Sequence, residues 1–224
     1  MSRDLPIARV PDLADASLRG SWLNKAVPNS GDDYSANGND ATTITPNAKW
    51  TKNGIWFPGT DDGLETFGAD VKLFDAYPFA MSCWFKCDDD SVRGIILSVV
   101  NSTRGDTMYD ISVLDDEVYL RVQNTTVYNL ITTGSAAPEG QWNHVVGLFA
   151  GVQERYIYVN GELEGTDITN SANYSGNVDR WSVGRIGDSS PSNYFAGEIR
   201  DARFRGRALT ADEIKYEYRL GVPQ

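Results

Sequence analysis

Apolar and polar residues alternate with a period of two along most of the chain after about residue 50. The clearest run is Phe79–Cys87, in which every odd position is apolar, so one face of an extended strand enters a core. The other runs are short and are bounded by Gly, Asn, Asp or Pro, as is typical of antiparallel strands. Further strands are predicted at Gly94–Val100, Tyr109–Leu114, Glu117–Gln123, Thr126–Thr132, Trp142–Phe149, Arg155–Asn160, Trp181–Ile186 and Phe195–Phe204. The pattern predicts an all-β sandwich or barrel.

Two short turns predict hairpins between neighbouring strands. Asp115-Asp116 separates two alternating runs, and Asn160-Gly161 is a pair that tolerates the positive φ angles of a type I′ turn. Because a short hairpin joins strands of opposite direction, both turns predict an antiparallel sheet.

One short helix is predicted near the C-terminus. Thr210 is followed three residues later by Glu213, which is the spacing of a helix capping box, and a glycine and a proline shortly afterwards supply a stop. We therefore expect a helix at Ala211–Arg219.

The chain of 224 residues contains no internal repeat, low-complexity tract or linker, which favours a single domain over residues 19–224. Residues 1–18 form the exception, because Pro6 and Pro11 stand among scattered apolar residues and predict an extended N-terminal arm. Two alternatives are open for this arm. It packs on its own domain, or residues 2–18 exchange between subunits and hold a homo-oligomer such as a trimer.

Charge and cysteine content limit the partners. The 31 acidic and 20 basic residues give a net charge of −11, which disfavours nucleic acid and anionic membranes as partners. No apolar stretch is long enough to span a membrane, and the first residues lack the apolar core of a signal peptide, so we expect the chain to stay where it is made or to leave by lysis. Cys83 and Cys87 are too far apart on one strand to form a disulfide with each other. A nucleophilic thiol would need His144 nearby, which the sequence does not show, so buried thiols are the favoured interpretation.

Several segments stand in an order that resembles the laminin-G-like, concanavalin A-like jelly-roll family in its stand-alone bacterial or phage form. The segments are Gly20–Asn24, Asp33–Ala41, Phe57–Asp62, Phe79–Lys86, Gln141–Val145, Tyr156–Gly161, Phe195–Ile199 and Arg207–Thr210. The resemblance covers roughly residues 20–219. It implies two antiparallel sheets of about six or seven strands, one of them concave, with the C-terminal strand beside the N-terminal one.

The resemblance also implies a candidate calcium site. In the family, a loop like the one that holds Asp33, Asn37 and Asn39 often binds calcium together with an acidic residue after the late Gly-x-Ile motif, and oxygen donors suit this ion. Here Arg200 stands at that acidic position and Asp201 follows it. Three readings are open: a calcium ion on these residues, a guanidinium of Arg200 in its place, or a hydrogen-bonded turn.

A candidate ligand-binding surface lies on the predicted strand Glu117–Gln123. Its even positions are apolar, so its odd positions face the other way and could offer an aromatic ring and polar donors to a sugar. Trp84 and Lys86 are predicted to join this face. The candidate residues are Trp84, Tyr119, Arg121 and Gln123. A solvated outer face, or a face covered by a loop or a partner, would show the same alternation.

The sequence gives little support to catalysis. The hydrolases that share this fold carry Glu-x-Asp-x-x-Glu on one strand, and this spacing does not occur in the chain. No Gly-x-Ser-x-Gly elbow, phosphate loop or dinucleotide fingerprint occurs either. His144 shares a strand face with apolar residues, so we expect it in or at the rim of the core with a hydrogen-bond partner.

These observations predict a non-catalytic jelly-roll module that works by surface contact. The specific hypothesis is a structural or adhesion protein of a phage virion, either capsid decoration or tail, assembled in the host cytoplasm and with affinity for glycans. The expected partners are a glycan or a virion or capsid protein surface, and calcium is the candidate cofactor. A free-standing carbohydrate-binding lectin and a glycoside hydrolase are the alternatives.

Overall fold

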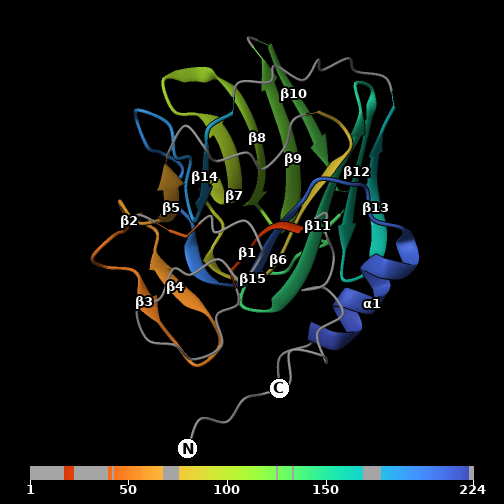
Figure 1. Ribbon diagram of the computed structural model, residues 1–224. Helices are drawn as coiled ribbons and strands as arrows, with labels where there is room; N and C mark the ends of the chain where they lie inside the picture. The colour runs from red at the N-terminus through yellow and green to blue at the C-terminus, as the bar shows by residue number, and fades with distance from the viewer. Residues whose placement is uncertain are drawn as a thin grey trace, which may run out of the picture.

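The computed structural model describes residues 18–22, 40–41, 43–67, 76–124, 126–132, 134–168 and 178–221. In these ranges two antiparallel sheets face each other, and the helix α1 (Ala211–Gly221) lies on the outside (Figure 1). The eight-stranded sheet runs in the order β13 (Glu162–Asp167), β12 (Glu154–Val159), β11 (Trp142–Gly151), β6 (Phe79–Asp89), β15 (Ala196–Arg205), β4 (Ile55–Pro58) and β3 (Lys49–Trp50), and β1 (Leu18–Trp22) also pairs with β15. The seven-stranded sheet runs in the order β10 (Thr126–Ile131), β9 (Glu117–Asn124), β8 (Arg104–Leu114), β7 (Gly94–Asn101), β14 (Arg180–Val183), β5 (Leu64–Phe67) and β2 (Thr43–Ile44). The predicted antiparallel two-sheet β-sandwich with one short C-terminal helix is confirmed.

All nine predicted strands are present, most of them with ends shifted by one or two residues. The short strands β2 to β5 and the edge strand β13 were not predicted, because runs of two to six residues carry little periodicity, and β1 was expected from the family resemblance alone. The strand predicted at Trp181–Ile186 ends at Val183. Gly184 has a φ of +85°, and a Cβ there would lie 3.1 Å from the ring of Phe57, so the chain turns at this glycine.

Both predicted hairpins are confirmed by their backbone angles. Asp115 and Asp116 have φ of 51° and 61°, and Asn160 and Gly161 have φ of 52° and 84°. Positive φ at both central residues is the requirement of a type I′ turn, whose twist matches that of the flanking strands. The first turn joins β8 to β9 and fixes their register.

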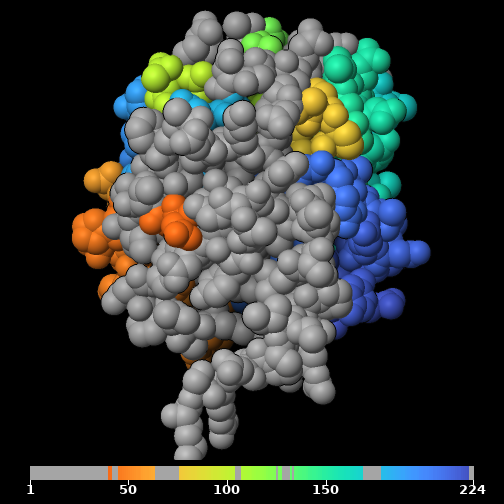
Figure 2. All heavy atoms as spheres, viewed as in Figure 1, coloured from red at the N-terminus to blue at the C-terminus, as the bar shows by residue number. Residues whose placement is uncertain are grey.

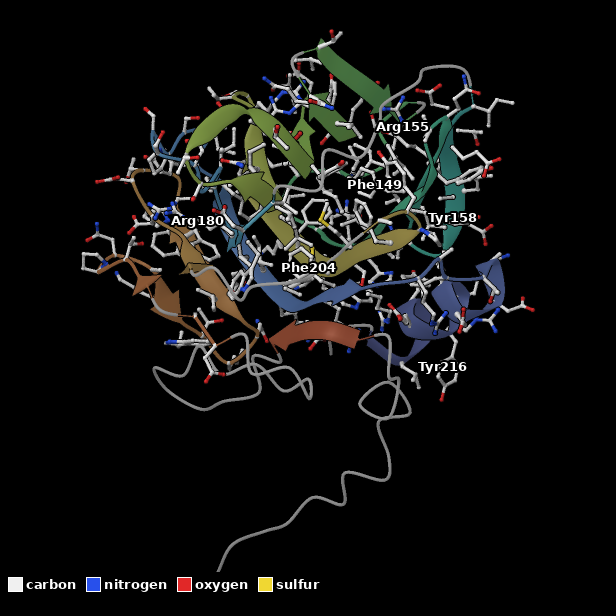
Figure 3. The ribbon with its side chains drawn as sticks, turned by 45° about the horizontal axis from the view of Figure 1, so that its top comes forward. Phe149, Arg155, Tyr158, Arg180, Phe204 and Tyr216 are labelled. Atoms are coloured by element: carbon white, nitrogen blue, oxygen red, sulfur yellow. The ribbon has the colours of Figure 1, made fainter. Side chains whose placement is uncertain are left out.

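Aromatic side chains fill the space between the sheets. Phe79 and Phe149 stack with ring centroids 4.5 Å apart, and Tyr109 meets them edge-on at 5.1 and 5.4 Å. Figure 3 shows Phe149 in this interior. Cys83 and Cys87 point into the same core as free buried thiols, and burial raises the pKa of both. The interpretation as buried thiols is confirmed, because both side chains are 1% exposed.

The helix α1 covers part of the outer face of the eight-stranded sheet. The predicted capping box is present, since the backbone N–H of Thr210 donates to Glu213 and that of Glu213 donates to the Thr210 hydroxyl, at 2.8 and 3.3 Å. Ile214 packs with Leu148 and other apolar residues of β6, β11 and β12. Figure 2 shows α1 at the surface beside β12 and β13. The helix therefore adds a third layer to one side of the sandwich.

The strand β1 pairs with β15, with Leu18 opposite Arg205 and Trp22 opposite Ala202. This confirms the expected pairing of the first strand beside the last one. The predicted extended arm 1–18 lies outside the described residues except for Leu18, so its exchange between subunits stays a prediction. No helix in the described part of the chain is long and apolar enough to cross a membrane.

Candidate functional site

The candidate site is the polar half of the outer face of the seven-stranded sheet. Alternate residues of β8 and β9 enter the core, and those between them face outward. The hairpin register places Asp110 opposite Arg121 and Ser112 opposite Tyr119. Three of the four candidate residues from the sequence, Tyr119, Arg121 and Gln123, therefore share one surface.

A buried ion pair holds Arg121 in place. Its Nε lies 2.5 Å from Oδ2 of Asp110, whose side chain is 0% exposed against 13% for Arg121. Burial raises the pKa of the Asp110 carboxyl, and the charge and hydrogen bond of Arg121 oppose this effect. Oδ1 of Asp110 and Nη2 of Arg121 have no hydrogen bond of ordinary geometry with the described residues. Asp110 thus acts as a buried support that orients a partly exposed guanidinium.

A second guanidinium lies beside the first. Arg93 precedes β7, and its Cζ lies 4.1 Å from the ring centroid of Tyr119. Its Nη1 donates to the Ser112 hydroxyl at 3.2 Å, and the Tyr119 hydroxyl donates to Glu117 at 3.4 Å. Arg93, Tyr119, Arg121 and Gln123, together with Asp110 and Ser112, are named here the β8–β9 surface.

The neighbouring part of the same face is covered by the chain that follows β14. The hydroxyls of Ser98 and Ser182 lie 3.0 Å apart, and the carbonyl oxygen of Arg185 lies within hydrogen-bond distance of both, at 3.0 and 3.2 Å. Ile186 packs with Met108 and two apolar residues of β7. This half of the face is structural, whereas the β8–β9 surface carries the partly exposed polar groups.

The structure separates Trp84 from the other three candidates. Trp84 lies in β6 of the opposite sheet, is 2% exposed and stacks on Tyr218 of α1 with centroids 5.5 Å apart. Lys86 lies on the same strand. The prediction that Trp84 and Lys86 share a face with Tyr119 is therefore wrong, because strand alternation shows which side of a strand a residue occupies but not which sheet holds the strand.

Arg93, Asp110 and Ser112 were missed by the sequence reasoning. A signal for two of them existed, since a two-residue turn at Asp115-Asp116 places Asp110 opposite Arg121 when residues are counted outward from it. Arg93 lies in the turn before β7, outside any predicted strand, so the alternation of apolar and polar residues could not assign it to this face.

Arg200 lies next to the helix end. Its Cζ lies 5.6 Å from the Trp84 ring centroid and 5.3 Å from that of Trp142, and it donates to the carbonyl of Gly221. Its Nε is 3.8 Å from Oδ2 of Asp201.

Asp33, Asn37 and Asn39 fall outside the described residues, so both the calcium site and its replacement by Arg200 stay predictions. Among the residues that are described, no group of three His, Cys, Asp or Glu side chains is placed to hold a metal ion.

His144 lies on the outer face of β11 beneath α1. It is 1% exposed, and its Nε2 is 3.8 Å from Oε2 of Glu217. Burial, aided by nearby arginines, lowers the pKa of His144 to about 3. Neither ring nitrogen has a hydrogen bond with the described residues, so the expected burial is confirmed but the expected hydrogen-bond partner is not found.

Acid–base chemistry of the kind used by glycosidases requires an accessible carboxyl with a raised pKa. Among the described Asp and Glu side chains, burial raises the pKa of Asp110, but this carboxyl is fully buried against Arg121. The pKa of Glu213 is lowered to about 2 by the hydrogen bonds from Arg207. Neither group is suited to protonate a substrate.

Residues 58–215 match the family model described as the concanavalin A-like lectin/glucanases superfamily, Laminin_G_3. None of the curated proteins matches the sequence. Among solved structures, the botulinum neurotoxin serotype D binding domain is similar at a TM-score of 0.66 and 18% identity, over 91% of this chain and 50% of that chain. The serotype G binding domain gives 0.67 and 14%, over 91% and 51%. The Ruminococcus gnavus IT-sialidase CBM40 bound to alpha2,3 sialyllactose gives 0.62 and 19%, over 74% and 95%. The chain therefore spans about half of the neurotoxin domains, and at these identities the likeness is one of fold.

Proposed function

Because the chain belongs to the concanavalin A-like lectin/glucanases superfamily, we propose that it is a non-catalytic module that binds glycans through the β8–β9 surface. The observation that carries the proposal is the pair of fixed guanidiniums, Arg93 over the Tyr119 ring and Arg121 on buried Asp110. Planar groups and hydrogen-bond donors held rigidly on a sheet suit sugar rings and hydroxyls at low entropic cost.

The charge of this surface favours an acidic sugar. The guanidiniums of Arg93 and Arg121 gather here on a chain whose net charge is −11, and of the two nearby carboxylates, Asp110 and Glu117, that of Asp110 is fully buried. Guanidiniums bind carboxylates and sulfates in a forked geometry. The fold shared with a CBM40 bound to alpha2,3 sialyllactose, and with neurotoxin binding domains, supports a glycan or receptor as the partner.

An array of neutral, sialylated, uronic-acid and sulfated glycans tests the proposal. We expect acidic glycans to be retained, and Arg93→Ala and Tyr119→Ala each to weaken binding about tenfold, which corresponds to about 1.4 kcal/mol. Arg219→Ala and Tyr216→Ala are matched controls, because both residues lie exposed on α1. Figure 3 shows Tyr216 pointing away from the sandwich. Retention of no glycan, or equal loss in the controls, would reject the proposal.

The narrower hypothesis of a phage capsid-decoration or tail protein rests on the sequence resemblance. It includes the trimer held by residues 2–18. Native mass spectrometry of the full chain and of a chain without residues 2–18 tests this part, since monomers in both samples would exclude arm exchange.

A further inference from the structure

A row of four side chains crosses the outer face of the eight-stranded sheet, next to the part that α1 covers. Glu198 of β15 lies opposite Trp56 of β4 on one side and opposite Lys86 of β6 on the other. Lys86 in turn lies opposite Trp142 of β11. These strands are neighbours in the sheet (Figure 1). Trp56, Glu198, Lys86 and Trp142 are named here the tryptophan row.

All four side chains of the tryptophan row face outward and are partly exposed. The residues before or after them in each strand are fully buried in the core, for example Phe57, Phe85 and Ile199. The next row of the same face, which contains Trp84 and His144, is buried beneath α1. The tryptophan row is therefore the polar and aromatic edge of a face that the helix leaves open.

Several contacts orient the row. The indole N–H of Trp56 donates to Asp88 at 2.9 Å, and the hydroxyl of Thr51 donates to Oε1 of Glu198 at 2.6 Å. Arg200 lies 5.3 Å from the ring centroid of Trp142. Groups held in this way lose little conformational freedom when a ligand binds.

We propose that the tryptophan row is a second ligand site, which binds a neutral oligosaccharide lying across the strands. The two indoles stand three strand spacings apart, about 14 Å, a length that one sugar ring cannot bridge. Indole rings suit the apolar faces of sugars. Between them, the carboxylate of Glu198 accepts and the ammonium of Lys86 donates hydrogen bonds to hydroxyls.

The charge of the row selects a neutral ligand. Glu198 and Lys86 lie side by side and carry opposite charges. The charges next to the two indoles are also of both signs, since Lys49 lies 5.5 Å from the Trp56 ring centroid, Asp88 accepts from the Trp56 indole and Arg200 lies 5.3 Å from the Trp142 centroid. Mixed charges of this kind serve hydroxyl groups and give little net attraction to a charged ligand. A protein partner would need about 800 Å² on each side, and four side chains in a line do not supply such an area. The row lies on the sheet opposite the β8–β9 surface, so the inference stands independently of the proposed function.

Calorimetric titration with cellohexaose, laminarihexaose and mannohexaose tests the inference. We expect at least one of them to bind, with a change in tryptophan fluorescence. Trp56→Ala and Trp142→Ala should each weaken binding about tenfold, and together about a hundredfold, because distant sites act additively. Glu198→Gln and Lys86→Met remove little bulk and should weaken binding several-fold with unchanged melting temperature. Tyr216→Ala is the aromatic control.

The outcomes separate the two sites. Binding that survives the double tryptophan variant, or no binding of any of these hexaoses, overturns the tryptophan row as a site. Loss of hexaose binding in Arg93→Ala with full binding in Trp56→Ala also overturns it, and leaves the β8–β9 surface as the site. Loss in the tryptophan variants with full binding in Arg93→Ala supports the inference, whatever the result of the acidic glycan array.

Discussion

Replacing Glu217 of α1 by glutamine should strongly destabilise the fold. Glu217 is 5% exposed, and its Oε1 lies 2.5 Å from Nη2 of Arg205, whose side chain is 1% exposed. Arg203 and His144 approach its other oxygen at 3.9 and 3.8 Å. Glutamine keeps the size of the side chain but removes the carboxylate charge that faces the buried Arg205.

Breaking a buried ion pair by removing one partner costs about 3–5 kcal/mol. For a domain of this size each kcal/mol lowers Tm by about 2–4 °C, so the expected loss is about 6–20 °C. Calorimetry and urea unfolding measure it. Replacing both partners, as in Glu217→Leu with Arg205→Met, should recover most of the loss, because an apolar pair of similar volume leaves no buried charge unpaired.

The control is Glu154→Gln, which removes an exposed carboxylate of β12 and should change stability by less than about 0.5 kcal/mol. A loss of less than about 1 kcal/mol in the unfolding free energy of Glu217→Gln would refute the reasoning. The same holds if the loss in the double variant equals the sum of the losses in Glu217→Leu and Arg205→Met alone.

Three further predictions concern stability. His144 is the single histidine of the chain, and its pKa of about 3 in the fold lies below its unfolded value, so the unfolded state takes up the proton first. Unfolding free energy should fall by about 1 kcal/mol per unit as pH drops from 6 to 5, and His144→Met should remove this slope in urea titrations. Gly197→Ala should lower Tm by several degrees, since φ is +140° and a Cβ would lie 2.1 Å from a carbonyl oxygen of β6, whereas Gly151→Ala, with contacts of 3.8 Å or more, should not. Asp110→Asn should cost about 3 kcal/mol in urea unfolding because it leaves Arg121 partly buried without its counter-charge, and unchanged stability would contradict the buried pair.

Local sequence determined much of this fold. Except for β13, the strands from Phe79 onward follow from period-two alternation, and the helix follows from Thr210 and Glu213. Hairpin turns also fix register, so the pairing of Asp110 with Arg121 could have been found by counting from the turn between β8 and β9. These features depend on residues close in sequence, where backbone propensities and turn geometry act directly.

Features that depend on distant residues could not be predicted. Trp84 and Tyr119 both face outward from their strands, but membership of opposite sheets depends on the pairing of β6 with β11 and β15. The tryptophan row joins residues as far apart as Trp56 and Glu198, which meet only when the sheet has formed. The cover that buries His144 comes from a helix more than sixty residues later.

Chemical-shift mapping during glycan titration tests the central claim most directly. The protein, labelled with ¹⁵N, is titrated with the acidic glycan that the array retains most strongly, and amide and sugar anomeric signals are followed together. The account predicts shifts concentrated on β8, β9 and the Arg93 turn, with the anomeric signals of the glycan intact after prolonged incubation. Shifts confined to other surfaces, or new reducing-end signals from cleavage, would contradict a non-catalytic binding module that acts through the β8–β9 surface.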